Sequence, residues 1–269
     1  MAEGDVLLSV EGLQLTLGGK RILDGVSFQV TDRVRPGEVT GQIVSLLGPS
    51  GVGKTRTLRI IAGLDQADAG QVRGEGGREL SMGSVGVVFQ NYPLLRHRTV
   101  LDNLVVAGLT AGQSGADARK KAEELLARFD LADRGDLYPA QLSGGQRQRA
   151  AIAQQLMNQR QLLILDEPFS GLDPAALLEV VGLLVEVAHM DEANTLIIVT
   201  HDIRAAMLAS DLLFMLGRDL DAKGKPGGGA KVKRTYDLFQ LGLAWRADVE
   251  SDPRFAPLEK EIKDAFRTL

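Results

Sequence analysis

Residues 43–55 read IVSLLGPSGVGKT and are the most informative segment of the sequence. An apolar, strand-sized run leads into a loop of the pattern G-x-x-x-x-G-K-[ST], and a helical pattern follows it. The glycines let the loop curl so that successive backbone N–H groups face phosphate oxygens. Lys54 adds a positive charge at the β and γ phosphates, and Thr55 offers its hydroxyl to Mg²⁺. The loop therefore predicts a site for a nucleoside triphosphate with Mg²⁺. The residues assigned to nucleotide binding are Gly48, Pro49, Ser50, Gly51, Val52, Gly53, Lys54, Thr55 and Arg56.

Strand-like and helical stretches alternate around this loop, which is typical of an α/β sheet. Several strand-like runs are almost continuously apolar, so we expect mainly parallel strands that are covered on both faces. The first forty residues differ, because closely spaced runs at 7–10, 13–17 and 26–30 predict antiparallel hairpins at one edge. After Gln90 the strand pattern disappears, and apolar residues at helical spacing in 116–129 predict a helical insert.

A second candidate element is the run LLILDE at residues 162–167. It delivers Asp166 and Glu167 at the carboxyl end of a strand, where the ligands of α/β sheets collect. Paired acids alone are more often a solvated turn, so their meaning depends on the loop at Gly48. With that loop, we assign Asp166 to Mg²⁺, directly or through water. Glu167 is assigned as the general base or water-positioning residue.

The third element is the sequence LSGGQ at residues 142–146, which opens an alanine-rich helical pattern. Ser143 is a good N-cap, and two glycines at a helix start leave N–H groups open to an anion. A nucleotide held by Lys54 does not need a second cradle from the same chain. We therefore expect this helix start to contact a nucleotide held by another copy. The residues assigned to this contact are Leu142, Ser143, Gly144, Gly145 and Gln146.

The composition is that of an ordinary globular protein, with 269 residues, 44% of them hydrophobic and 25% charged. A formal net charge of −4 argues against a generally basic surface, so no nucleic-acid partner is expected. No apolar run approaches the roughly 18 residues that would span a bilayer, and the acidic N-terminus does not look like a signal peptide. The lack of cysteine excludes disulfides, thiolate catalysis and cysteine metal sites, and it is compatible with a cytoplasmic protein.

Together these motifs resemble the ATP-binding cassette (ABC) ATPases, the nucleotide-binding subunits of ABC transporters. Their order is that of the family across roughly residues 6–217, and LSGGQ is the family's signature. The resemblance implies a P-loop NTPase fold of the ABC-ATPase type. Such a fold has a mainly parallel core sheet, an N-terminal antiparallel β subdomain and an α-helical subdomain.

The resemblance also implies how the site works. Two subunits, here expected to form a homodimer, would pair head to tail, with each ATP between the Lys54 loop of one and the signature of the other. Gln90 would contact Mg²⁺ or the attacking water and sense the membrane partner. Asp173 would bridge the two sites, and His201 would reach the γ-phosphate. Hydrolysis would then require both the dimer and Mg²⁺.

We interpret residues 1–269 as one ABC ATPase domain. Residues 1–90 and 160–217 are expected to form a RecA-like core with the antiparallel part, and 91–159 a helical subdomain. Residues 218–269 are expected to form a hairpin and helix extension. One phosphate loop and one signature predict a single cassette without fused membrane spans or a large regulatory domain.

Three positions depart from the family pattern. Leu17 stands where an aromatic residue commonly stacks on adenine, so base stacking is expected to be weak or supplied by another residue. Residues 31–40 look like several extra residues in the loop before the phosphate strand. Arg204 stands where a glutamate is frequent.

The C-terminal part is similar to the nitrate, sulfonate and taurine importer branch. This similarity implies import of a small solute, with integral membrane permease subunits and a solute-binding protein as partners, at the cytoplasmic face of the inner membrane. The exposed apolar loop 91–100 suits a groove for a partner's cytoplasmic helix. Two alternatives share every nucleotide motif: a soluble ABC ATPase of a non-membrane assembly, such as iron–sulfur cluster assembly, and a lipid or exporter-type cassette. They differ in their partners.

Overall fold

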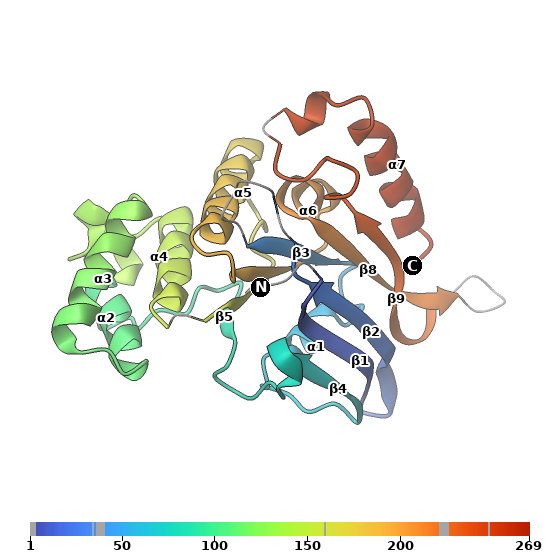
Figure 1. Ribbon diagram of the computed structural model, residues 1–269, viewed down its shortest axis with the longest axis horizontal. Helices are drawn as coiled ribbons and strands as arrows, with labels where there is room; N and C mark the ends of the chain where they lie inside the picture. Colours follow the sequence, from blue (N-terminus) through green and yellow to red (C-terminus); the bar gives the residue numbers. More distant parts are fainter. Residues whose placement is uncertain (1–3, 34, 36–40, 159, 221–225, 247) are drawn as a thin grey trace.

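The computed structural model describes residues 4–33, 35, 41–158, 160–220, 226–246 and 248–269. In this part of the chain, a nine-stranded mixed sheet has the order β4-β1-β2-β9-β8-β3-β7-β6-β5 (Figure 1). Its strands are β1 (Val6–Leu17), β2 (Lys20–Thr31), β3 (Gln42–Leu47), β4 (Ala69–Gly74), β5 (Gly86–Val88), β6 (Leu162–Asp166), β7 (Thr195–Thr200), β8 (Leu212–Leu220) and β9 (Pro226–Asp237). The α-helices are α1 (Lys54–Ile61), α2 (Val100–Thr110), α3 (Gly115–Arg128), α4 (Gly144–Leu156), α5 (Pro174–His189), α6 (Ile203–Ala209) and α7 (Phe255–Phe266). Short 3-10 helices cover Glu75–Gly77, Ala132–Arg134, Pro139–Gln141 and Val249–Ser251.

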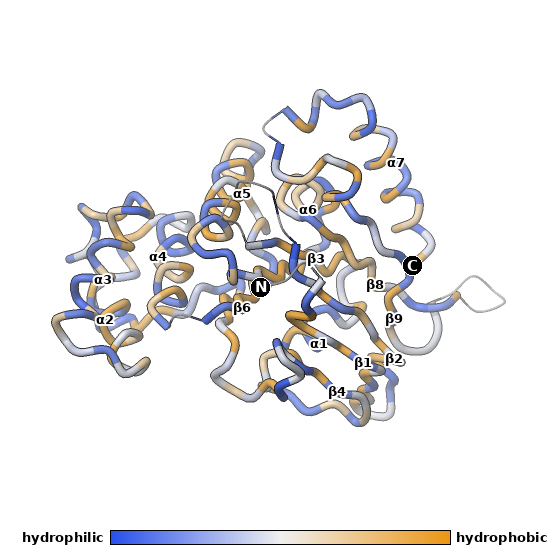
Figure 2. The backbone as a smooth tube through the Cα atoms, in the orientation of Figure 1, coloured by the Kyte–Doolittle hydropathy of each residue, from blue (hydrophilic) through white to orange (hydrophobic). Residues whose placement is uncertain are grey.

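The predicted parallel core is confirmed. Strand β3 pairs in parallel with β7 and β8, and β6 pairs in parallel with β7 and β5. All six residues of β3 are buried, because helices cover both faces of the sheet. Leu46 packs in one cluster with Leu58 of α1, whereas Leu47 packs in another with Ala206 of α6. Figure 1 shows α1 on one side of β3 and α5, α6 and α7 on the other, and Figure 2 shows the apolar strands between them.

The N-terminal antiparallel part is also present, with one difference in detail. The runs at 7–10 and 13–17 belong to a single strand, β1, which pairs antiparallel with β2 and β4. A register shift between Val10 and Leu13 bends this strand, and Gly12 there adopts a φ of 61° that favours glycine. The polar residues between the two runs therefore mark a bulge within one strand.

Helices α2, α3 and α4 form the helical insert and lie together at one end of the molecule (Figure 1). Their facing residues, such as Leu104, Ala118 and Ile152, are fully buried in one cluster. Ser114 caps α3 and Ser143 caps α4, each accepting a hydrogen bond from a backbone N–H in the first turn. The helix periods predicted from the sequence are thus confirmed.

The expected insertion at residues 31–40 is described only at 31–33 and 35. Two of its arginines hold the C-terminal part of the chain. Arg33 makes a bidentate pair with Asp237 at 2.8 and 2.7 Å. Arg35 pairs with the fully buried Asp211, and its guanidinium carbon lies 3.7 Å from the ring centroid of Trp245. These contacts give the insertion a structural role, because they join it to both ends of the β8–β9 hairpin and to the segment beyond.

Arg204, the other unexplained departure, also faces the C-terminal part. Its guanidinium pairs with the carboxylate of Glu250, which follows the β8–β9 hairpin. A glutamate at position 204 would repel Glu250, so the arginine suits the extension that this chain carries.

Candidate functional site

The phosphate loop connects β3 to α1, as the sequence predicts. Gly51 and Gly53 have φ values of 75° and 126°, which a residue with a side chain rarely adopts. A Cβ at Gly53 would lie 2.8 Å from Leu23 Cδ2, so β2 approaches the loop closely at this point. Both glycines are therefore needed for the backbone path. Val52, in contrast, is buried, so its side chain anchors the loop in the core.

Lys54 points into the curl of this loop. Its ammonium donates hydrogen bonds to the carbonyl oxygens of Gly48 at 2.8 Å and Pro49 at 3.3 Å. The side chain is only 5% exposed, and this burial lowers the pKa of Lys54. The loop therefore holds a partly desolvated positive charge.

Arg56 does not share this arrangement. Its guanidinium pairs with Asp65 at 2.9 Å, and Arg59 pairs with the same carboxylate. The structure thus places the Arg56 side chain outside the loop, and only its backbone N–H in the first turn of α1 is close to the predicted nucleotide site.

Thr55 and Asp166 meet although they are 111 residues apart, with Thr55 Oγ1 donating to Asp166 Oδ1 at 3.3 Å. Asp166 is the last residue of β6, and burial raises its pKa above the ordinary 3.8. A hydroxyl and a carboxylate are oxygen ligands of the kind that Mg²⁺ prefers, with phosphate oxygens and waters as the rest of its shell. The described residues contain no cluster of three or more acidic, histidine or cysteine side chains suited to a metal. This donor set fits a Mg²⁺ that arrives with a nucleotide.

Glu167 makes contacts with two other segments, residues 199–201 and the phosphate loop. Its Oε2 lies 2.9 Å from Nδ1 of His201 and accepts a hydrogen bond from the Thr200 hydroxyl at 3.3 Å. Its Oε1 lies 3.5 Å from the Lys54 ammonium. Glu167 also has a φ of 50°, an uncommon value for a residue with a side chain, and its N–H bonds to the carbonyl of Val199 at 2.8 Å. The strained backbone therefore directs this carboxylate toward the phosphate loop.

Gln90 follows β5 and is exposed. Its amide donates to the Ser170 hydroxyl at 3.3 Å, and among the described residues it has no hydrogen bond to Thr55, Asp166 or Glu167. The structure thus places Gln90 beside the segment that follows Glu167, at the edge of the cluster.

The signature forms the start of α4. Ser143 and Gln146 make a reciprocal capping box, with N–H to side-chain oxygen distances of 3.2 and 3.0 Å. Apart from the adjacent residues and the helix's own backbone, no atom of the described residues lies within 4 Å of the positions that a Cβ would take at Gly144 and Gly145, so this helix start is open. The Leu142 side chain is buried in the helical core and serves packing.

Within the described residues, no hydrogen bond or ion pair joins the signature to the phosphate loop of the same chain. The signature helix is instead joined to the segment after β6, because the buried amide of Gln148 donates to the carbonyl of Pro168 at 3.0 Å, directly after the Asp166–Glu167 pair. Asp173, farther along, caps α5 and accepts from two backbone N–H groups at 2.9 and 3.0 Å. The prediction that the signature contacts a nucleotide held by another copy therefore stays a prediction.

The departure at Leu17 is visible in the structure. Leu17 ends β1 at the turn to β2, and 41% of it is exposed. Sequence analysis missed a second feature near the loop: Arg218 of β8, which donates to the carbonyl of Gly51 at 3.3 Å. A basic residue just after an apolar strand run was the signal that could have drawn attention to it.

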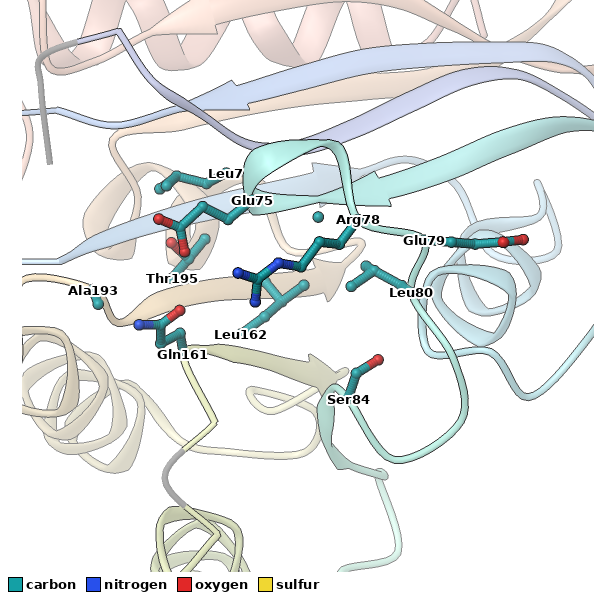
Figure 3. A pocket seen from close by; sticks show the side chains of 11 residues that line it. Leu7, Glu75, Arg78, Glu79, Leu80, Ser84, Gln161, Leu162, Ala193 and Thr195 are labelled. Carbon is teal, nitrogen blue, oxygen red and sulfur yellow. The ribbon is translucent and has the colours of Figure 1, made fainter.

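Several clefts of the described residues lie outside this cluster, and two of them matter for the site. A cleft of about 420 Å³ is lined by the loop after Gln90 and by Arg147 at the start of α4. A second one, of about 230 Å³, lies between Arg78 and Gln161 near Leu162 and Thr195 (Figure 3). Those last two residues begin β6 and β7, whereas Lys54, Asp166 and Glu167 lie at the opposite, carboxyl edge of the sheet. The cleft in Figure 3 is therefore separate from the candidate site.

Comparison with known proteins identifies the family to which this chain belongs. The family described as ABC transporter matches residues 33–170. A protein named sulfate/thiosulfate import ATP-binding protein CysA from Pectobacterium atrosepticum is 42% identical over 71% of this chain and 60% of its own length. A protein of the same name from Burkholderia mallei is 38% identical over 90% of this chain and 69% of its own length. The chain thus spans about 60% of the first of these relatives.

Solved structures agree with this comparison. The structure of cbiO1 from Clostridium perfringens, described as part of the ABC transporter complex cbiONQ, superposes with a TM-score of 0.73 at 24% identity. The match covers 96% of this chain and 99% of that one, so the two share a fold. A dimeric ATP-binding cassette bound to ADP and Pi in a post-hydrolysis state superposes with a TM-score of 0.66 at 26% identity, over 86% and 99% of the two chains.

Proposed function

Because this chain belongs to the ABC transporter family, we propose that it binds MgATP and hydrolyses it to ADP and phosphate to drive transport through separate membrane subunits. The main support for this proposal is that Lys54, Glu167 and His201, from three separate segments, meet at the carboxyl edge of the sheet. Glu167 lies 3.5 Å from the Lys54 ammonium and 2.9 Å from Nδ1 of His201.

In this proposal the phosphate loop, residues 48–55, binds the triphosphate. Its backbone N–H groups and the start of α1 favour negative charge, and Lys54 exchanges its carbonyl partners for phosphate oxygens. Thr55 and Asp166 would hold Mg²⁺, which would neutralise charge on the phosphates. The hydrogen bond between these two side chains supports this assignment, because it keeps their oxygens together.

Glu167 is proposed as the general base. A water oxygen attacks the γ-phosphorus, its proton passes to the Glu167 carboxylate, and ADP leaves with the electrons of the broken P–O bond. His201 is proposed to orient Glu167 and reach the γ-phosphate, which its 2.9 Å contact supports. Gln90 is proposed to reach the metal or the water from the edge of the cluster.

A second copy of the chain is proposed to complete each site. The open helix start at Gly144 and Gly145 offers N–H groups, yet it makes no contact with the loop of its own chain in the described residues. A partner's nucleotide can use those groups if two copies pair head to tail. Asp173, at the start of α5, is proposed to bridge the two sites across this dimer.

The membrane partner is proposed to bind near Gln90. The cleft of about 420 Å³ beside it is lined by the loop that was expected to receive a partner's helix, including Tyr92 and Leu94. No helix in the described residues is long and apolar enough to cross a membrane. The permease subunits would then hold this chain at the cytoplasmic face of the inner membrane.

Import of a small oxyanion is the proposed direction and substrate class, with a solute-binding protein as a further partner. The two relatives cited above are named for import of sulfate or thiosulfate. These names support the importer interpretation, and within it they favour sulfate or thiosulfate over nitrate, sulfonate or taurine.

The test measures release of phosphate from MgATP by the purified chain and by Glu167→Gln, with Glu179→Gln, an exposed position on α5, as the matched control. Hydrolysis by the parent and the control, but not by Glu167→Gln, supports an ATPase.

Affinity purification from membranes then distinguishes a membrane partner from a soluble one. Copurification of integral membrane proteins supports the transporter, and their absence, with a soluble assembly recovered instead, supports the alternative.

A further inference from the structure

Arg218 lies against the phosphate loop from the side of β8. Strand β8 is the parallel neighbour of β3, so both strands end at the same edge of the sheet. The two strands are in close contact there, since a Cβ at Gly48 would lie 2.6 Å from the carbonyl oxygen of Leu216. Two residues later, Arg218 Nη2 donates to the carbonyl of Gly51 at 3.3 Å.

The charge of Arg218 is not neutralised within the described residues, unlike that of its neighbours. Lys231 and Lys233 on β9 both pair with Asp219, at 2.9 and 2.5 Å. Arg234 pairs with Glu261 at 3.8 Å. Among the described residues, Arg218 has only the Gly51 carbonyl as a partner, and its buried Nε has no hydrogen-bond partner. A guanidinium with spare donors is therefore held beside the loop, without a carboxylate from the described part of the chain.

The contact to Gly51 is significant because of where that carbonyl lies in the loop. Gly51 is exposed, has a φ of 75° and has open space around its Cβ position, so little packing restrains its carbonyl. On the other side of the same peptide, the Val52 N–H donates to the carbonyl of Pro49 at 3.3 Å. A peptide is planar and trans, so fixing the Gly51 carbonyl also fixes the Val52 N–H, which points the opposite way. Arg218 thus restricts a loop that must present N–H groups to phosphate.

We propose that Arg218 is a positioning residue for the nucleotide phosphates. It holds the Gly51 carbonyl in place and supplies a positive charge beside the loop that no carboxylate of the described residues neutralises. This inference rests on the proposed function. It predicts that removal of Arg218 weakens nucleotide binding more for nucleotides with more phosphates. The overall fold should be unchanged, because the side chain is partly exposed.

The experiment measures the affinities of ATP, ADP and AMP by competition with a fluorescent ATP analogue, for the parent, Arg218→Ala and Arg218→Lys. Arg234→Ala is the matched control, since it removes an arginine of the same hairpin. Arg218→Ala is expected to weaken ATP and ADP about tenfold, the loss of one charge-assisted contact, and AMP much less. Arg218→Lys should recover part of the loss, because it restores the charge without the fork.

The outcomes separate this inference from the proposed function. If Arg218→Ala binds ATP like the parent while Lys54→Ala does not bind, the role of Arg218 is wrong and the ATPase stands. If Arg218→Ala weakens ATP and AMP equally, or Arg234→Ala does the same, the effect is not on the phosphates and the inference is also wrong. If the parent binds no nucleotide, both proposals fail. Circular dichroism melts of each variant check whether the fold is kept.

Discussion

The ammonium of Lys54 lies 3.5 Å from Oε1 of Glu167, so the cation assigned to phosphate and the base assigned to water are ion-pair partners. Burial lowers the pKa of Lys54, and the Glu167 carboxylate opposes this shift. Phosphate oxygens would compete with Glu167 for the same ammonium. Nucleotide binding is therefore expected to release the carboxylate, which then keeps His201 as its partner.

Lys54→Ala is expected to abolish ATP binding. The substitution removes the charge at the β and γ phosphates and takes the Lys54 donor from the Gly48 carbonyl, whereas the Pro49 carbonyl keeps the Val52 N–H at 3.3 Å. Calorimetry at low salt should show a sharp loss of affinity. Binding of MgATP within a few-fold of the parent would mean that the loop is assigned wrongly.

Asp166→Asn is expected to stabilise the protein while reducing hydrolysis. Because burial raises the pKa of Asp166 above 3.8, the folded protein holds this proton more tightly than the unfolded chain. Ionisation of Asp166 therefore costs stability above its folded pKa, and that cost disappears as the pH falls below about 3.8. Asparagine carries no such cost and keeps an oxygen for Thr55.

The measurement is the free energy of unfolding by urea at several pH values. The variant should exceed the parent at pH 8, and the difference should shrink as the medium is acidified. A variant that is less stable than the parent at pH 8, or a difference that does not change with pH, would contradict the role of burial at this carboxylate.

Leu17 predicts poor discrimination between ATP and GTP, because stacking of a base on an aromatic ring contributes on the order of 1–3 kcal/mol and Leu17 supplies none. Leu17→Tyr should therefore raise the affinity for ATP by about tenfold. Turnover of both nucleotides by the parent checks the first statement. A preference for ATP above about a hundredfold would show that another residue recognises the base.

The pair between Arg35 and Asp211 is expected to matter for stability. Asp211 is fully buried and also accepts a hydrogen bond from the backbone N–H of Ile43 at 2.8 Å. Arg35→Ala would leave that carboxylate uncompensated, at a cost of about 3–5 kcal/mol. Arg204→Ala breaks the exposed pair with Glu250 and should cost no more than about 1 kcal/mol. Equal losses in chemical denaturation would contradict this ranking.

The sequence predicts what is local and misses what depends on distant contacts. The phosphate loop is encoded in adjacent residues, so its position between β3 and α1 follows from the glycines and the flanking apolar patterns. The signature cap is local in the same way. Arg218 could not be found like this, because it reaches Gly51 across 167 residues and only the β3–β8 pairing brings them together.

The same limit explains the departures from the family pattern. The neighbouring residues in the sequence do not explain an arginine at position 204, because its partner, Glu250, lies in the C-terminal part of the chain. Arg56 belongs to the motif by position, yet its side chain pairs with Asp65. The tertiary structure determines which partners an exposed side chain finds. A sequence motif therefore predicts the path of the backbone better than the contacts of individual side chains.

In the proposed mechanism, two copies share each nucleotide and Glu167 is the base. Glu167→Gln keeps the shape of the side chain but cannot take the proton, so hydrolysis should fall by roughly 10²–10⁴ while ATP binding survives. Bound ATP should then hold two chains together between the Lys54 loop of one and the Ser143 signature of the other. Ser143→Arg in the same chain should prevent pairing, because it places bulk and charge at the open helix start.

The most direct measurement is light scattering on Glu167→Gln during size-exclusion chromatography, with and without saturating MgATP, beside Glu179→Gln and the double variant Glu167→Gln/Ser143→Arg. We expect a dimer for Glu167→Gln with MgATP. We expect monomers for the same protein without nucleotide and for the double variant with MgATP. A Glu167→Gln protein that remains monomeric at saturating MgATP, or that hydrolyses ATP at the parental rate, would contradict the shared site.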